Sequence, residues 1–193
     1  MENKMYKKQM LTQKIVCYVL LAAAALVFIY SLGLVTDLHY NNFAYYAENP
    51  EKPKFEGANI YNEIQPFNRQ LTAVGIALIL SSVVVFVFGA HKRRKYYIGN
   101  YITIGLNSAL MIGSSVWGIR NVRIYRQMYD QIDFEKLEKL QGALKKDYNI
   151  SSFWFDVGYY VFAFAILAAV LGILNVVFKI IVMRGERKLL EEV

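Results

Sequence analysis

The chain has 193 residues and a formal net charge of +7, which allows one domain or two small ones. Its apolar fraction of 56% is above, and its charged fraction of 19% below, the usual values for soluble globular proteins. The positive charge does not indicate nucleic-acid binding, because the basic residues flank apolar runs instead of gathering on a soluble helix or loop. The few histidines and the single cysteine leave little room for a metal site, and we expect no cofactor.

Four uncharged runs organise the chain: residues 15–36, 71–90, 96–119 and 157–178. Each has the roughly 20 residues that a helix needs to cross the hydrocarbon core of a bilayer. Backbone amides in lipid must be satisfied within the protein, and at this length only a helix does that. The sequence therefore predicts an all-α integral membrane protein, with one domain built as a four-transmembrane-helix bundle in a lipid bilayer.

The first run, residues 15–36, follows several lysines, as the apolar part of a signal peptide does. It is longer than such a segment, however, and no clear small-residue cleavage site follows it. We therefore expect an uncleaved anchor. Cys17 lies within this run, where its expected role is that of a small buried hydrophobic side chain.

The first outer loop, residues 37–70, is rich in Tyr and Asn and has no clear period. We expect it to be irregular. Two interpretations remain open for it: an ordered cap or partner surface, in which exposed Tyr and Asn supply contacts, and a solvated connector.

The hinge between the second and third runs, residues 91–95, carries a dense block of positive charge. Its cations are Lys92, Arg93, Arg94 and Lys95. Lys and Arg accumulate in short cytoplasmic loops, and both ends of the chain are also basic. The sequence thus predicts a cell-membrane protein whose hinge and two termini are cytoplasmic, with the hinge cations at the lipid headgroups.

The third run, residues 96–119, has two contrasting faces. Gly105, Ala109 and Gly113 share one of them, and small residues spaced by four allow another backbone to approach closely. In the fourth run, Ala168 and Gly172 share a similar face. We expect both sets to be helix-packing residues and the third helix to be central in the bundle.

Polar side chains occupy the opposite face of the third helix and the edge of the small face of the fourth. The predicted intramembrane polar residues are Thr103, Asn107, Ser114 and Asn175. We expect Asn107 and Asn175 to make hydrogen bonds between helices, each worth roughly 0.6–2 kcal/mol.

The second outer loop, residues 120–156, has a helical pattern. An apolar stripe that includes Tyr125 and Tyr129 changes phase after Asp133, a plausible N-cap, so we expect two helices bent near that residue. The stripes should be covered by the first outer loop or by a partner protein. The predicted partner-binding residues are Tyr125, Tyr129, Leu137, Leu140 and Leu144. A nearby row of cations, Arg120, Arg123 and Arg126, is expected to be solvated or to contact phosphate.

No sequence pattern indicates an enzyme. The chain has no G-x-S-x-G, P-loop or dinucleotide fingerprint, and none of the four runs contains a charged residue or histidine, which argues against ion-coupled transport. We expect a non-catalytic membrane subunit or scaffold that packs with another membrane protein or with itself and presents its outer loops. The alternative is a small oligomeric channel or passive transporter, lined by Asn107 and Ser114 of the polar third helix.

Overall fold

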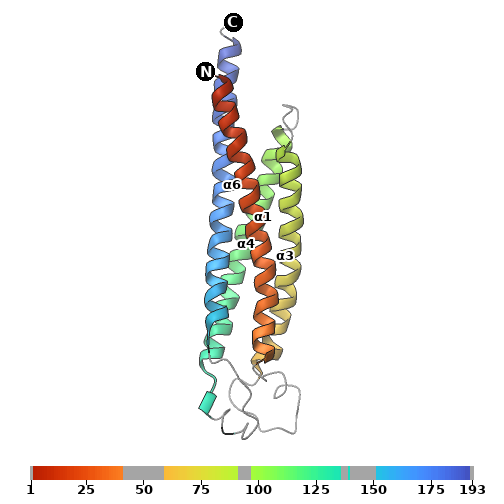
Figure 1. Cartoon of the computed structure of the whole chain (residues 1–193), viewed down its shortest axis with the longest axis vertical. Helices are drawn as coiled ribbons and strands as arrows, with labels where there is room; N and C mark the ends of the chain where they lie inside the picture. Colours follow the sequence, from red (N-terminus) through yellow and green to blue (C-terminus); the bar gives the residue numbers. More distant parts are fainter. Residues whose placement is uncertain (1, 41–58, 91–96, 136–138, 140–150, 192–193) are drawn as a thin grey trace. The chain divides into compact units, whose positions relative to one another are not determined.

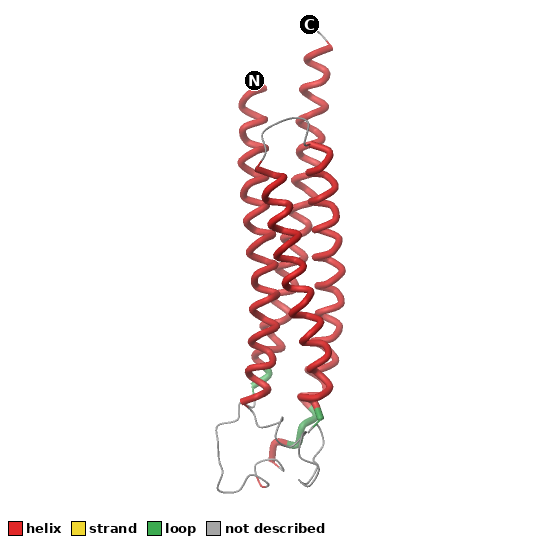
Figure 2. Tube along the Cα trace, turned by 90° about the vertical axis from the view of Figure 1, so that its right-hand side faces the viewer, coloured by secondary structure: helices red, strands yellow, loops and turns green. Residues whose placement is uncertain are grey.

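The computed structural model describes residues 2–40, 59–90, 97–135, 139 and 151–191. In this part of the chain the long elements are α1 (Glu2–Tyr40), α3 (Ile60–Ala90), α4 (Tyr97–Asp130) and α6 (Phe153–Glu191) (Figure 1). Figure 2 draws these helices in red and the described non-helical residues in green. Each of the four helices is long and apolar enough to cross a membrane. The predicted all-helical, multi-pass membrane architecture is therefore confirmed.

The helices extend beyond the uncharged runs that predict them. Their membrane-compatible parts are Lys7–Leu34, Ile60–Gly89, Gly99–Asp130 and Phe153–Gly185. As a result, the predicted first outer loop is helical at both of its ends, because α1 continues to Tyr40 and α3 already begins at Ile60. The expectation of irregular structure was wrong for those ends. The rest of that loop, residues 41–58, lies outside the described residues.

Local signals explain where α3 and α6 begin. At α3, the Glu63 amide donates to the Asn59 carbonyl at 3.0 Å, and the Glu63 carboxylate lies in the first turn, where it favours the helix dipole. At α6, Ser151 Oγ accepts a hydrogen bond from the Phe153 amide at 3.1 Å in a serine turn that leads into the helix, and Asp156 lies in the first turn, where it favours the helix dipole. These starts depend on polar residues that lie outside the predicted spans.

The tertiary contacts group the chain into two compact units. Unit 1 comprises Met1–Leu26, Ile76–Ser115 and Ala163–Val193, and unit 2 comprises Val27–Gly75 and Val116–Phe162. Each of the four helices contributes one segment to each unit. The two units have different interiors, and we describe each by itself.

In unit 1, neighbouring helices run antiparallel. Gln13 of α1 donates to the Gly89 carbonyl of α3, and Tyr101 of α4 donates to Met183 Sδ of α6 at 2.8 Å. The Lys179–Gln13 and Ser81–Asn107 hydrogen bonds join these two helix pairs to each other. The interior of unit 1 contains many polar side chains.

In unit 2, aromatic rings fill the interior. The rings of Tyr30 and Phe162 meet edge to face with centroids 5.6 Å apart, and those of Phe67 and Trp117 lie 5.1 Å apart. Glycines make room for the rings, since a methyl group on Gly118 would overlap the Phe162 ring. This interior therefore depends on shape-matched packing of large side chains.

The helix α4 ends at Asp130, and residues 131–133 are not helical. Phe134 and Glu135 are helical again. The second of the two outer helices that the sequence predicts falls on residues 136–138 and 140–150, which lie outside the described residues. This part of the chain contains three residues that were predicted to bind a partner: Leu137, Leu140 and Leu144. The hinge cations Lys92, Arg93, Arg94 and Lys95 also lie outside the described residues, because residues 91–96 are not described.

Candidate functional site

The interior of unit 1 contains a buried lysine. Lys179 of α6 is 1% exposed, and its Nζ donates a hydrogen bond to Gln13 Oε1 of α1 at 3.1 Å. The ammonium also lies 5.7 Å from the centroid of the Tyr101 ring of α4, within the range of a cation–π interaction. A charged side chain inside a membrane-spanning segment is costly, and its presence there marks a candidate functional site.

Gln13 connects this lysine to a second polar group and to a third helix. Its Nε2 donates to the main-chain carbonyl of Gly89 at 3.0 Å, and its Oε1 accepts from Gln9 Nε2 at 3.1 Å. Gly89 packs tightly at this position, because an added Cβ would lie 3.1 Å from both Gln13 Nε2 and Cys17 Sγ. Lys179, Gln13, Gln9, Gly89 and Tyr101 form a group that we call the lysine network.

The sequence analysis missed this network. It placed the end of the fourth span at residue 178 and counted no charge inside the spans, whereas α6 continues and buries the next residue, Lys179. A signal did exist, because Gly172, Asn175 and Lys179 recur at helical spacing on one face, and so do Gln9, Gln13 and Cys17 on α1. Treating the first charge after an apolar run as its boundary hid this signal.

Asn107 is buried at 2% exposure and bonds across to α3. Its Oδ1 accepts from Ser81 Oγ at 3.0 Å, and its Nδ2 donates to Ser82 Oγ at 3.3 Å. The other two predicted polar residues of this helix bond to their own backbone: Thr103 to the Gly99 carbonyl and Ser114 to the Met111 carbonyl. Asn107 therefore joins α4 to α3 of the same chain.

Asn175 is also buried at 2% exposure, but it differs from Asn107 in its surroundings. Neither its Oδ1 nor its Nδ2 has a hydrogen-bond partner within the described residues. The same holds for Ser108 Oγ and Asn100 Oδ1 of α4. Buried polar atoms are rarely left unpartnered, so each of these needs an explanation.

The two predicted small-residue faces differ in their contacts: the face on α6 packs against another helix, whereas the face on α4 is exposed. On α6, Ala168 is fully buried, and a Cβ added at Gly172 would lie 2.9 Å from Ser108 Oγ of α4. On α4, Gly105, Ala109 and Gly113 are exposed, and a Cβ added at either glycine would meet nothing within 4 Å. Within the described residues this α4 face meets no other helix, because the opposite, polar face of α4 points inward. Helix packing at Gly105, Ala109 and Gly113, in the bundle or in an oligomer, stays a prediction.

Tyr129, a predicted partner-binding residue, is 2% exposed in unit 2. Its ring contacts Phe134 and Phe155, the latter on the first turn of α6. Tyr125 bonds to the Glu63 carbonyl of α3 at 2.9 Å and packs against Phe67. Tyr129 is therefore covered by side chains of its own chain, whereas partner binding by Tyr125 and Tyr129 stays a prediction.

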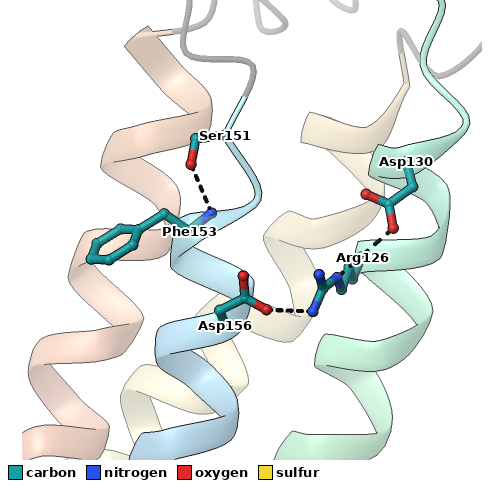
Figure 3. A network of polar contacts seen from close by, with 5 residues as sticks. All are labelled: Arg126, Asp130, Ser151, Phe153 and Asp156. Carbon is teal, nitrogen blue, oxygen red and sulfur yellow. Dashed lines mark hydrogen bonds and ion pairs between the residues drawn. The ribbon is translucent and has the colours of Figure 1, made fainter.

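Arg126 is the centre of a polar cluster in unit 2. Its guanidinium forms ion pairs with Asp156 of α6 and with Asp130 one turn along α4 (Figure 3). Arg120 and Arg123 are exposed on α4. Arg126 thus pairs α4 with α6, whereas Arg120 and Arg123 face outward.

A pocket of about 200 Å³ adjoins the lysine network in unit 1. Its lining includes Cys17 and Gly89, together with the exposed Lys14 and the paired rings of Tyr18 and Phe86. Cys17 is buried, as expected from the sequence.

No known protein family, curated protein or solved structure matches this chain.

Proposed function

We propose that this chain is a non-catalytic multi-pass subunit or scaffold of the cell membrane. It packs against another membrane protein or a second copy of itself through the face of α4 formed by Gly105, Ala109 and Gly113, which we call the open α4 face, and it presents its outer loops for binding. The observation that carries the proposal is that this face consists of small residues spaced by four and is exposed. Such spacing allows close approach of a second helix in a membrane.

The use of glycine elsewhere in the chain supports this role. An added Cβ at Gly75 would lie 2.8 Å from the Phe28 Cα, and one at Gly172 would lie 2.9 Å from Ser108 Oγ. Both glycines thus permit helices to approach each other closely. The open α4 face offers the same geometry with no partner among the described residues, and exposed apolar residues such as Leu106 and Leu110 lie beside it.

The test uses two differently tagged copies of the chain, expressed together in cells and extracted in mild detergent. We expect co-isolation of the second copy, or of one defined membrane protein identified by mass spectrometry, and a strong loss of it in Ala109→Leu. The matched control is Ala22→Leu, the same change at an exposed position of α1 in the same unit. Equal recovery from the two variants would argue against the open α4 face as the interface.

The orientation is the second part of the proposal. The dense cations at residues 92–95 and the basic tails support a cytoplasmic hinge and cytoplasmic termini. In a Cys17→Ser background, Gly57→Cys should react with an impermeant thiol reagent in intact cells, whereas Lys95→Cys should react only after permeabilisation. The reverse pattern would invert the topology.

A passive transporter of small polar solutes is the second candidate, and the polar interior of unit 1 favours it. Asn100, Asn107, Ser108 and Asn175 are all buried there. Proteoliposomes containing the full chain should then equilibrate a small uncharged solute faster than empty liposomes do, and Asn175→Leu should slow this. Equal rates with and without the protein would exclude the candidate.

A further inference from the structure

Four buried polar atoms of unit 1 that have no partner within the described residues lie between α4 and α6: Asn100 Oδ1, Ser108 Oγ and the two side-chain polar atoms of Asn175, whereas Ser115 Oγ lies farther along α4. The antiparallel register shows this, because Gly172 lies against Ser108 and Ile104, whereas Lys179 and Met183 lie against Tyr101. Asn175 is between these two levels, about 4.5 Å along the helix axis from Gly172.

The α4 side of this place is defined by the same register. Asn100, Ile104 and Ser108 are all buried and recur every four residues, so they share the inward face of α4. On α1, Leu20 Cδ1 lies 3.7 Å from the position of a Gly172 Cβ, and Gln13 contacts Lys179, so Cys17 is at the level of Asn175. We call the group of Asn100, Ser108 and Asn175 the amide cluster.

The chemistry of the amide cluster decides what can bind to it. Two amide oxygens require donors, the Asn175 amide nitrogen requires an acceptor, and the Ser108 hydroxyl can act as either. An anion accepts only and would leave the two oxygens unsatisfied. A cation cannot satisfy the amide nitrogen and would be repelled by the ammonium of Lys179, one turn along α6. The matching ligand is therefore small, uncharged and able both to donate and to accept.

We propose that the amide cluster binds ordered water molecules, which bridge Asn175 of α6 to Ser108 and Asn100 of α4 beside the lysine network. Buried water typically makes about three hydrogen bonds to polar groups that would otherwise be unsatisfied, and this cluster supplies that number of partners. The water makes unit 1 a hydrated interior at membrane depth. The inference is independent of the open α4 face, because the two sets of residues lie on opposite faces of α4.

The first experiment locates water directly in the full chain, reconstituted in nanodiscs. X-ray radiolysis produces hydroxyl radicals from bound water in place, and methionine is a sensitive reporter of them. Ile104→Met puts a reporter into the amide cluster, and Leu34→Met puts one into the aromatic interior of unit 2; both native side chains are 1% exposed. We expect the Ile104→Met reporter to be oxidised several-fold faster. Equal, slow oxidation of the two reporters would overturn the proposal.

The second experiment uses the sign of a stability change. If the cluster is dry, Asn175→Leu removes unsatisfied atoms and should raise the thermal midpoint in detergent. If water bridges the cluster, the same change displaces the water and leaves Ser108 and Asn100 unsatisfied, so the midpoint should fall. The control is Asn107→Leu, which breaks bonds that lie within the chain and should lower the midpoint in either case. A higher midpoint for Asn175→Leu would contradict the water site.

Discussion

Units 1 and 2 are built from the same four helices, but they are held together by different interactions. Unit 2 packs aromatic rings against one another and against glycines, as Tyr30, Phe162 and Gly118 do. Unit 1 buries a lysine and several amides and hydroxyls, and hydrogen bonds join its helices. In lipid, where apolar burial drives helix association weakly, the two units represent two routes to stability: close packing and polar pairing.

The largest difference is expected from truncating a ring in unit 2. Phe162→Ala removes the edge-to-face partner of Tyr30 and leaves a cavity, so it should lower the free energy of unfolding by about 3–5 kcal/mol. Thermal or denaturant unfolding in detergent measures this change. The matched control is Leu167→Ala, at an exposed position of the same helix, which should cost much less. A similar loss in both variants would mean that unit 2 does not depend on its packed interior.

In the lysine network, we expect removal of the hydrogen-bond acceptor to destabilise the chain more than removal of the lysine charge does. Gln13→Leu removes one hydrogen-bond acceptor of the buried ammonium of Lys179, and we expect a loss of about 1.5–3 kcal/mol. Lys179→Met removes the charge itself and should be nearly neutral, because a well-packed apolar side chain avoids the desolvation of the ammonium. In the double variant, Lys179→Met should recover most of what Gln13→Leu lost. Additive effects of the two changes would show that the hydrogen bond contributes little.

Two glycines of α4 allow a comparison between a glycine that packs against a ring, Gly118, and one that meets nothing within 4 Å, Gly113. Gly118→Ala forces a methyl group into the Phe162 ring and should cost about 1–3 kcal/mol. Gly113→Ala meets nothing within 4 Å and should leave the stability of the isolated chain unchanged or slightly higher, because alanine favours helix. If Gly113→Ala instead weakens co-isolation of a partner, the open α4 face gains support.

The smallest effect is expected at the polar cluster of unit 2. Arg126 and Asp156 are 34% and 44% exposed, so solvent screens their ion pair, and Arg126→Met should cost about 0–1 kcal/mol. The part of this cost that comes from the ion pair should disappear at high salt. A large loss that persists in high salt would place Arg126 among the packing residues of unit 2.

The sequence by itself determined the number of long apolar helices and their approximate places in the chain. This was possible because the signal is local: a run without charges, long enough to cross a bilayer, has to satisfy its backbone within one helix. The same reasoning placed Gly105, Ala109 and Gly113 on one face of a helix and the polar residues on the other.

Only the tertiary structure decided which of these faces points inward. Periodicity shows that residues share a face, but a small-residue face and a polar face can each pack against a neighbour in a membrane, so the pattern leaves the choice open. The four-helix register put the polar face of α4 inside, opposite Gly172 and Lys179, and no other part of the chain that the structure describes covers the open α4 face. Lys179 was missed for the same reason, since a charge at the end of an apolar run becomes an interior group only when Gln13 of a distant segment lies beside it.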